Sequence, residues 1–140
     1  MQLNDCLFCK IQRKEISSDI IYSDEICFAI MDKFPSTYGH VLVIPNEHYP
    51  NYMETDPVVL KHLIKIAQRV AIAQERAFGN EGNKLVINCK EVGNQKIFHT
   101  HVHVLPYYEN TINIEREPLE KQAAKMREAL LVSHYSSSSK

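Results

Sequence analysis

The sequence lacks the features that mark membrane, secreted and nucleic-acid-binding proteins. It has no apolar run near the ~20 residues that a membrane-spanning helix requires, and its N-terminus lacks the pattern of a signal peptide. Its formal net charge is only −1 at pH 7, so no excess of positive charge indicates a nucleic acid or a membrane surface as partner. We therefore expect neither kind of partner.

Cysteine is also scarce, and its four copies do not form a framework typical of disulfides. With no N-x-S/T acceptor in the sequence, this composition favours a reducing compartment, which predicts a cytoplasmic protein. Cys6 and Cys9 form a C-x-x-C pair, which can supply half of a tetrahedral zinc site or a redox disulfide. The redox interpretation is weaker, because only five residues precede Cys6 and leave no room for a preceding strand.

Hydrophobic patterning predicts an α+β fold built on a five-stranded antiparallel sheet. Apolar runs bounded by turn residues predict its strands at 20–22, 26–31, 40–45, 85–88 and 97–104. Helical spacing predicts a short N-terminal helix over 6–14 and two main helices, at 57–79 and about 117–132. No repeat or linker divides the chain, so we expect one domain over residues 1–135 and a disordered tail at 136–140.

Three histidines alternate with other residues in the last predicted strand. Strand geometry predicts that His99, His101 and His103 project from one face, while Ile97, Val102 and Val104 face the core. The first and third Cα atoms would lie about 13 Å apart, an awkward spacing for one metal ion held by all three. A division of labour is easier, with one histidine as a metal ligand, one that reacts and one that supports it. A solvated histidine stripe is the alternative.

The motif around these histidines resembles that of the histidine triad (HIT) family, H-φ-H-φ-H-φ-φ, where φ is apolar. Further segments lie in the family's order and spacing, so that the resemblance covers residues 5–108: Phe8-Cys9-Lys10-Ile11, Gly39-His40-Val41-Leu42-Val43-Ile44-Pro45, Glu47-His48 and Gln95-Lys96-Ile97-Phe98-His99. The C-x-x-C pair and the F-H-T-H-x-H form are similar to the zinc-containing microbial branch, near the histidine-triad nucleotide-binding proteins.

The resemblance implies roles for the three histidines and for the C-x-x-C pair. His101 would be the nucleophile that attacks an α-phosphorus, and His103 would donate a hydrogen bond to a phosphate oxygen. Zn²⁺ would be held in a closed structural site without an open position for water. Its implied ligands are Cys6, Cys9, His48 and His99. The alternatives are an unmetallated cluster of the same four residues and a His48 that is a surface residue.

The resemblance also implies a nucleotide-binding site. Asp32 would accept hydrogen bonds from ribose hydroxyls, although it also fits a turn cap. Asn88 and Gln95 would contact the phosphate side, or Gln95 would only bond within the chain. An apolar slot for a flat purine would be lined by Phe8, Ile11, Ile16 and Ile30, which fit an ordinary core equally well. Several positions depart from the family pattern, including Thr100, where an apolar residue is common, and Tyr107-Tyr108, where a basic residue is frequent. Asn94 replaces a glycine, and Lys96 replaces a small hydroxyl or acidic residue, bringing a charge toward phosphate or pointing to solvent.

The resemblance therefore implies a nucleotide-binding hydrolase or transferase acting on purine nucleotide conjugates of the nucleoside phosphoramidate type, through a nucleotidyl-histidine intermediate. Dinucleoside polyphosphate hydrolysis is one alternative, and a nucleotide-binding adaptor with incidental turnover is another. Family members pair through the long helix and a sheet edge, and an exposed strand edge needs cover, so we expect a homodimer.

Overall fold

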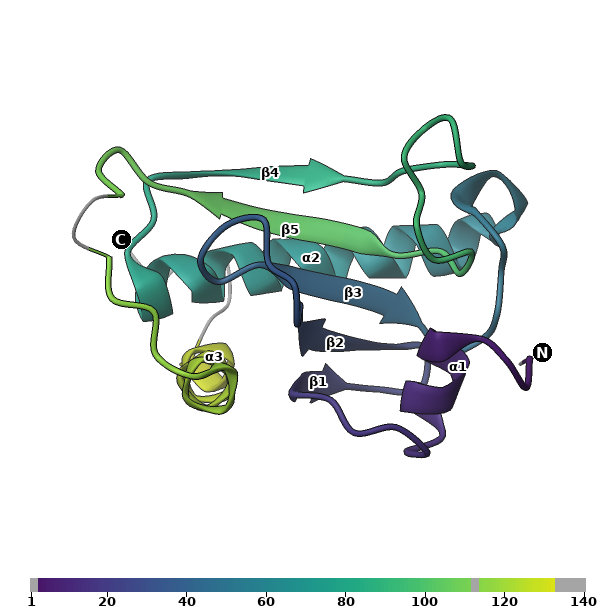
Figure 1. Cartoon of the computed structure of the whole chain (residues 1–140), viewed down its shortest axis with the longest axis horizontal. Coiled ribbons are helices and arrows are strands. Elements are labelled where there is room, and N and C mark those ends of the chain that lie inside the picture. The colour runs from purple at the N-terminus through teal and green to yellow at the C-terminus, as the bar shows by residue number, and fades with distance from the viewer. Residues whose placement is uncertain (1–2, 112–113, 133–140) are drawn as a thin grey trace.

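The computed structural model describes residues 3–111 and 114–132, and within them it contains a five-stranded antiparallel sheet and three α-helices (Figure 1). The strands are β1 (Ile20–Ser23), β2 (Cys27–Met31), β3 (Val41–Pro45), β4 (Gly82–Val86) and β5 (Val102–Tyr107), in the order β1-β2-β3-β5-β4. The helices are α1 (Leu7–Gln12), α2 (Pro57–Phe78) and α3 (Leu119–Val132), with a 3₁₀ turn at Tyr52–Glu54. The predicted α+β class is confirmed. The predicted tail at 136–140 lies outside the described residues.

The two faces of the sheet are covered differently. On one face α2 and α3 enclose the main core, in which Val43, Val70 and Met126 are fully buried. On the other face α1 covers only part of the sheet, packing Phe8 and Ile11 against side chains of β2 and β3. Figure 1 shows α2 running behind β5 and β3, with α1 near the ends of the central strands. The incomplete cover by α1 leaves room for a cavity on its face.

Helix α2 begins and ends where the sequence predicts. Asp56 accepts a hydrogen bond from the Val58 amide at 2.9 Å, Pro57 occupies the first turn, and Gly79 ends the helix in the left-handed conformation, with φ +72°. Among the described residues, no helix is long and apolar enough to cross a membrane.

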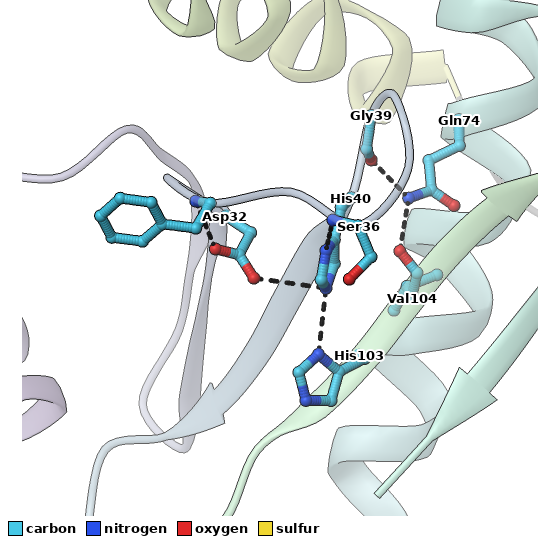
Figure 2. Close-up of polar contacts among 8 residues, drawn as sticks. Asp32, Ser36, Gly39, His40, Gln74, His103 and Val104 are labelled. Atoms are coloured by element: carbon cyan, nitrogen blue, oxygen red, sulfur yellow. Dashed lines mark hydrogen bonds and ion pairs between the residues drawn. The ribbon is translucent and has the colours of Figure 1, made fainter. Parts of the chain in front are cut away.

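A buried glutamine joins α2 to the sheet (Figure 2). The Gln74 amide donates to the Gly39 carbonyl at 2.9 Å and to the Val104 carbonyl at 3.1 Å. Gly39 has φ +86°, and a Cβ there would lie 2.7 Å from the Phe78 ring, so only glycine fits without strain. The loop that leads into β3 is therefore held in place by the helix behind it.

Two strand predictions are wrong in their positions. β4 begins at Gly82 because Gly82 and Asn83 pair with the end of β5, so the expected strand at 85–88 starts earlier and ends at Val86. β5 begins only at Val102, because the chain bends before it and the His99 amide donates to the Ile97 carbonyl at 2.9 Å.

This bend changes the predicted pattern of faces. Of the three histidines, only His103 lies in a regular strand. Ile97 packs with the α1 cluster rather than on the core face with Val102 and Val104. Because the chain leaves the regular strand, the three imidazoles turn toward different partners rather than forming one stripe.

Candidate active site and metal site

A cavity of about 550 Å³ lies on the face of the sheet that α1 covers in part. Its floor consists of one residue from each of four neighbouring strands: Ile30, Leu42, His103 and Val86. The strand register places these four residues side by side. Six residues that the sequence analysis assigns to substrate binding line this cavity together with His101: Phe8, Ile11, Ile16, Ile30, Asp32 and Asn88.

The remaining candidate, Gln95, does not line the cavity. Its side chain is buried and fully engaged in the loop after β4: it accepts from the Lys90 amide at 2.7 Å and donates to the Pro50 carbonyl at 2.7 Å and the Ile97 carbonyl at 3.0 Å. The neighbouring Asn94 has φ +73°, a conformation that glycine adopts most easily and asparagine tolerates. Gln95 thus holds the loop in shape while Asn94 and Lys96 face the cavity.

His101 is oriented by the carbonyl of His99. Its Nδ1 lies 2.7 Å from that oxygen, which requires a proton on Nδ1 and leaves the lone pair of a neutral ring on Nε2. Burial lowers the pKa of His101, although the carbonyl opposes this shift. The ring is therefore neutral near pH 7, and a neutral imidazole with a free Nε2 is the reactive form for nucleophilic attack.

His103 carries its proton on Nε2, whereas His101 carries its proton on Nδ1. The difference arises from a chain of hydrogen bonds that begins at Ser36 (Figure 2). The Ser36 amide donates to His40 Nδ1 at 3.1 Å, so the proton of the neutral His40 ring is on Nε2. That Nε2 lies 3.0 Å from His103 Nδ1 and 3.4 Å from a carboxylate oxygen of Asp32. Accepting on Nδ1 leaves His103 with its proton on Nε2, an atom that is buried without a partner in the described part of the chain.

The two neighbouring rings therefore offer complementary groups. The centroids of His101 and His103 lie 4.9 Å apart, and both side chains line the cavity. His101 offers a lone pair, and His103 offers a neutral N–H donor. Burial lowers the pKa of His103 to about 4, so this donor is uncharged at neutral pH. Such a pair can attack an electrophilic atom and at the same time stabilise negative charge on its oxygens.

His40 is a functional candidate that the sequence analysis missed. It is buried, and burial lowers its pKa to about 4, so it acts as a neutral link in the chain to His103. The available signal was its position two residues before Leu42, because side chains two apart in an extended chain lie on one face. Recognising it also requires the β3–β5 register, which sets Leu42 opposite His103 and which the sequence does not reveal.

Asp32 combines a structural and an electrostatic contact. One carboxylate oxygen accepts from the Phe34 amide at 2.8 Å, the turn cap that the sequence analysis considered as its alternative role. The other oxygen lies near His40, and the carboxyl lines the cavity. Burial raises the pKa of Asp32 above its ordinary value. The Asp32 carboxylate is thus available to a ligand through the oxygen that does not cap the turn.

Four residues form a cluster whose geometry fits a tetrahedral metal ion. Cys6 Sγ lies 3.3 Å from His99 Nδ1, while Cys9 Sγ lies 3.6 Å from His48 Nδ1 and 3.7 Å from His99 Nδ1. The two Nδ1 atoms are 3.1 Å apart. Tetrahedral zinc bonds would place sulfur and nitrogen about 3.5 Å apart, and two nitrogens about 3.4 Å apart. Two thiols and two imidazoles at these separations fit Zn²⁺.

The hydrogen bond on the other ring nitrogen of His99 also suits metal binding. His99 Nε2 lies 2.9 Å from the Pro45 carbonyl, so Nε2 donates and the lone pair is on Nδ1, facing the thiols. Burial lowers the pKa of His99 to about 4, which keeps the ring neutral as a ligand must be. The site is built from α1, the segment after β3 and the segment before β5, so an ion there would join three separate parts of the chain.

The cluster and the cavity are linked through His99 and Phe8. His99 contributes its ring to the cluster and its carbonyl to His101. Phe8, between the two cysteines, stacks edge-on against both rings, with centroid distances of 5.7 Å to His99 and 5.0 Å to His101. Any ion that fixes α1 and His99 therefore also fixes the surroundings of His101.

The buried His101 and the partly buried His103 lie side by side at the cavity, next to the cysteine–histidine cluster. Residues 13–110 match the HIT domain, and the chain belongs to the HIT domain family. A protein of Arabidopsis thaliana named adenylylsulfatase HINT3 is 36% identical over 88% of this chain and 62% of its own length. The chain thus spans less than two thirds of that relative.

Solved structures support the same family. A hypothetical histidine triad nucleotide-binding protein of Sulfolobus tokodaii superposes with a TM-score of 0.84 at 34% identity, covering 90% of this chain and 92% of the other. A zinc-bound histidine triad family protein of Mycobacterium smegmatis gives 0.83 at 32% identity, covering 91% and 94%.

Proposed function

We propose that this protein is a nucleotide-binding hydrolase or transferase that acts at the α-phosphate of purine nucleotide conjugates of the nucleoside phosphoramidate type. The observation that carries the proposal is the pair formed by His101 and His103. A lone pair on His101 Nε2 and an N–H on His103 Nε2 border one cavity, and their proton positions follow from the hydrogen bonds to His99 and His40.

In the proposed first step, His101 Nε2 attacks the α-phosphorus, the P–N bond to His101 forms, and the bond to the leaving group breaks. The leaving group takes the bonding electron pair, and an amine also takes a proton from solvent. His103 donates to a non-bridging oxygen of the phosphate, and the His99 carbonyl stabilises the positive charge that develops on the His101 ring. Water or another acceptor then attacks phosphorus and releases a proton to solvent, and the P–N electron pair returns to His101.

The nucleoside would bind at the end of the cavity that lies near β2. Asp32 would accept from ribose hydroxyls through the oxygen that lies near His40 and does not cap the turn. The apolar lining residues Phe8, Ile11, Ile16 and Ile30 would contact a flat purine. Asn88 would contact the phosphate from the β4 side. The three hydrogen bonds of Gln95 favour a positioning role for it over direct contact with phosphate.

We also propose that Zn²⁺ is held by the cluster of Cys6, Cys9, His48 and His99. With four protein ligands the ion would have no open position, so it would supply structural cohesion rather than activate water. The fit of the four ligand atoms and the zinc-bound neighbour from Mycobacterium smegmatis support this assignment.

A substrate panel tests the proposed function. We expect hydrolysis of adenosine 5′-phosphoramidate, measured by release of AMP. Faster turnover of diadenosine polyphosphates would favour the dinucleoside polyphosphate hydrolase instead. The name of the Arabidopsis relative adds adenosine 5′-phosphosulfate to the panel. Tight binding of AMP, with no conjugate hydrolysed faster than by a His101→Asn variant, would contradict the enzyme and favour a nucleotide-binding adaptor.

Two features support a homodimer as the working unit. β4 is an edge strand of the sheet with exposed side chains at Lys84 and Leu85, and α2 exposes Val58 and Ile64. Sedimentation velocity at micromolar concentration should give the mass of two chains, and a monomer there would contradict this assembly.

A further inference from the structure

The cavity has an uneven distribution of charge. Its charged lining residues are Asp32 and Lys33, which follow β2, and Lys96, which precedes His101 in the loop after β4. Lys96 is exposed and forms no hydrogen bond or ion pair with any residue in the described ranges. Its ammonium group therefore lies at the cavity wall without a carboxylate partner among the described residues.

The backbone that carries Lys96 is firmly held on both sides. Gln95 before it makes three hydrogen bonds, two of them to the Pro50 and Ile97 carbonyls, and Ile97 after it packs against the α1 cluster. These contacts fix where the lysine stem begins, and the four-carbon stem of a lysine is flexible. A fixed base and a mobile charged end suit binding of an anion whose position changes as a bond breaks.

The place of Lys96 along the cavity points to the leaving group. The β4–β5 ladder ends at the pair Val86 and His103, so Asn88, two residues further, lies toward His101. Asn88, Asn94 and Lys96 line the cavity from this side, whereas Asp32 lines it from β2. With the ribose at Asp32 and the α-phosphate at the histidines, the group that departs lies beside Lys96.

We propose that Lys96 is a specificity-determining residue that extends the leaving groups of this enzyme from amines to an anion, a sulfate joined to the α-phosphate as a mixed anhydride. This inference rests on the proposed function and deepens it. When the P–O bond breaks, its electron pair passes to the departing oxygen, which gains negative charge that the ammonium stabilises. Sulfate departs without a proton. An amine must be protonated to depart, and a neighbouring cation opposes that protonation.

The test compares two substrates that share the same nucleotide. The value of kcat/KM is measured for adenosine 5′-phosphosulfate and for adenosine 5′-phosphoramidate, and their ratio is the readout. Lys96→Met should lower the ratio at least about tenfold, the change that about 1.4 kcal/mol of lost transition-state stabilisation produces. Lys96→Arg keeps the charge and should preserve the ratio within about twofold. Lys90→Met removes the same charge from the same loop but away from the cavity lining, and it should also preserve the ratio.

The possible outcomes distinguish a failure of the role of Lys96 from a failure of the proposed function. An unchanged ratio in Lys96→Met, or an equal fall in Lys90→Met, would overturn the role of Lys96. A wild-type protein that hydrolyses the phosphoramidate but not the phosphosulfate would overturn that role and leave the proposed function standing. If neither conjugate is hydrolysed, the proposed function fails, and the role of Lys96 fails with it.

Discussion

Replacing His101 with asparagine is expected to lower kcat for phosphoramidate hydrolysis at least about 1000-fold, while AMP still binds. The asparagine amide nitrogen has no available lone pair, so the covalent route is closed and only binding and charge stabilisation remain. The neighbouring Phe8 ring and the His99 carbonyl keep their places because the side chains are similar in reach. Initial rates and calorimetric titration with AMP measure the two quantities separately.

His103→Asn is the matched control for this variant. Its amide retains an N–H donor but loses the link to His40 Nε2, so kcat should fall about 10- to 100-fold rather than vanish. A His101→Asn protein that retains more than a tenth of the wild-type kcat would show that another group attacks phosphorus.

Loss of a single thiol from the metal cluster is expected to have the largest effect on stability. The wild-type protein should contain about one zinc per chain by elemental analysis, and Cys9→Ser should contain less than a tenth of that. We expect the melting temperature of Cys9→Ser to fall by about 10 °C, because about 3 kcal/mol of metal-linked stability is lost at roughly 2–4 °C per kcal/mol. Treatment of the wild type with a strong chelator should give a similar shift.

Cys89→Ser provides the matched control, because Cys89 is a free cysteine outside the cluster. It should keep its zinc and its melting temperature. Cys9→Ser should also show slower turnover, since His99 joins the cluster to the carbonyl that orients His101. Wild-type protein purified without chelators that contains no zinc, and whose melting temperature does not respond to added zinc, would contradict the assignment.

Helices and strands that are determined by neighbouring residues in the sequence were predictable. Asp56, Pro57 and Gly79 mark the ends of α2, and the apolar run at Val41–Pro45 becomes a strand buried on both faces. The start of β5 was not predictable. It depends on a bend stabilised by a hydrogen bond from the Thr100 amide to the Tyr49 carbonyl, far away in the sequence. Alternation in the sequence cannot reveal such a contact.

The candidate site also has a part that was predictable from the sequence and a part that was not. The alternating histidines and the C-x-x-C pair indicated where the chemistry lies, and the resemblance to the HIT family supplied the other residues that meet at the cluster and the cavity. The role of His40 depends on the register between β3 and β5, and the role of Gln95 depends on carbonyls supplied by other segments. The sequence therefore predicted most of the side chains that lie together at the site, and tertiary structure determined which groups hold them in place.

The most direct test is to look for the covalent nucleotide on His101. The p-nitrophenyl ester of AMP supplies a good leaving group, so attack should outpace hydrolysis, and an alkaline quench preserves a P–N bond. Peptide mass spectrometry should then find one nucleotidyl group on the peptide containing His101, absent from the His101→Asn variant. Wild-type turnover of this ester with no adduct at His101, or with the adduct on another residue, would contradict the account.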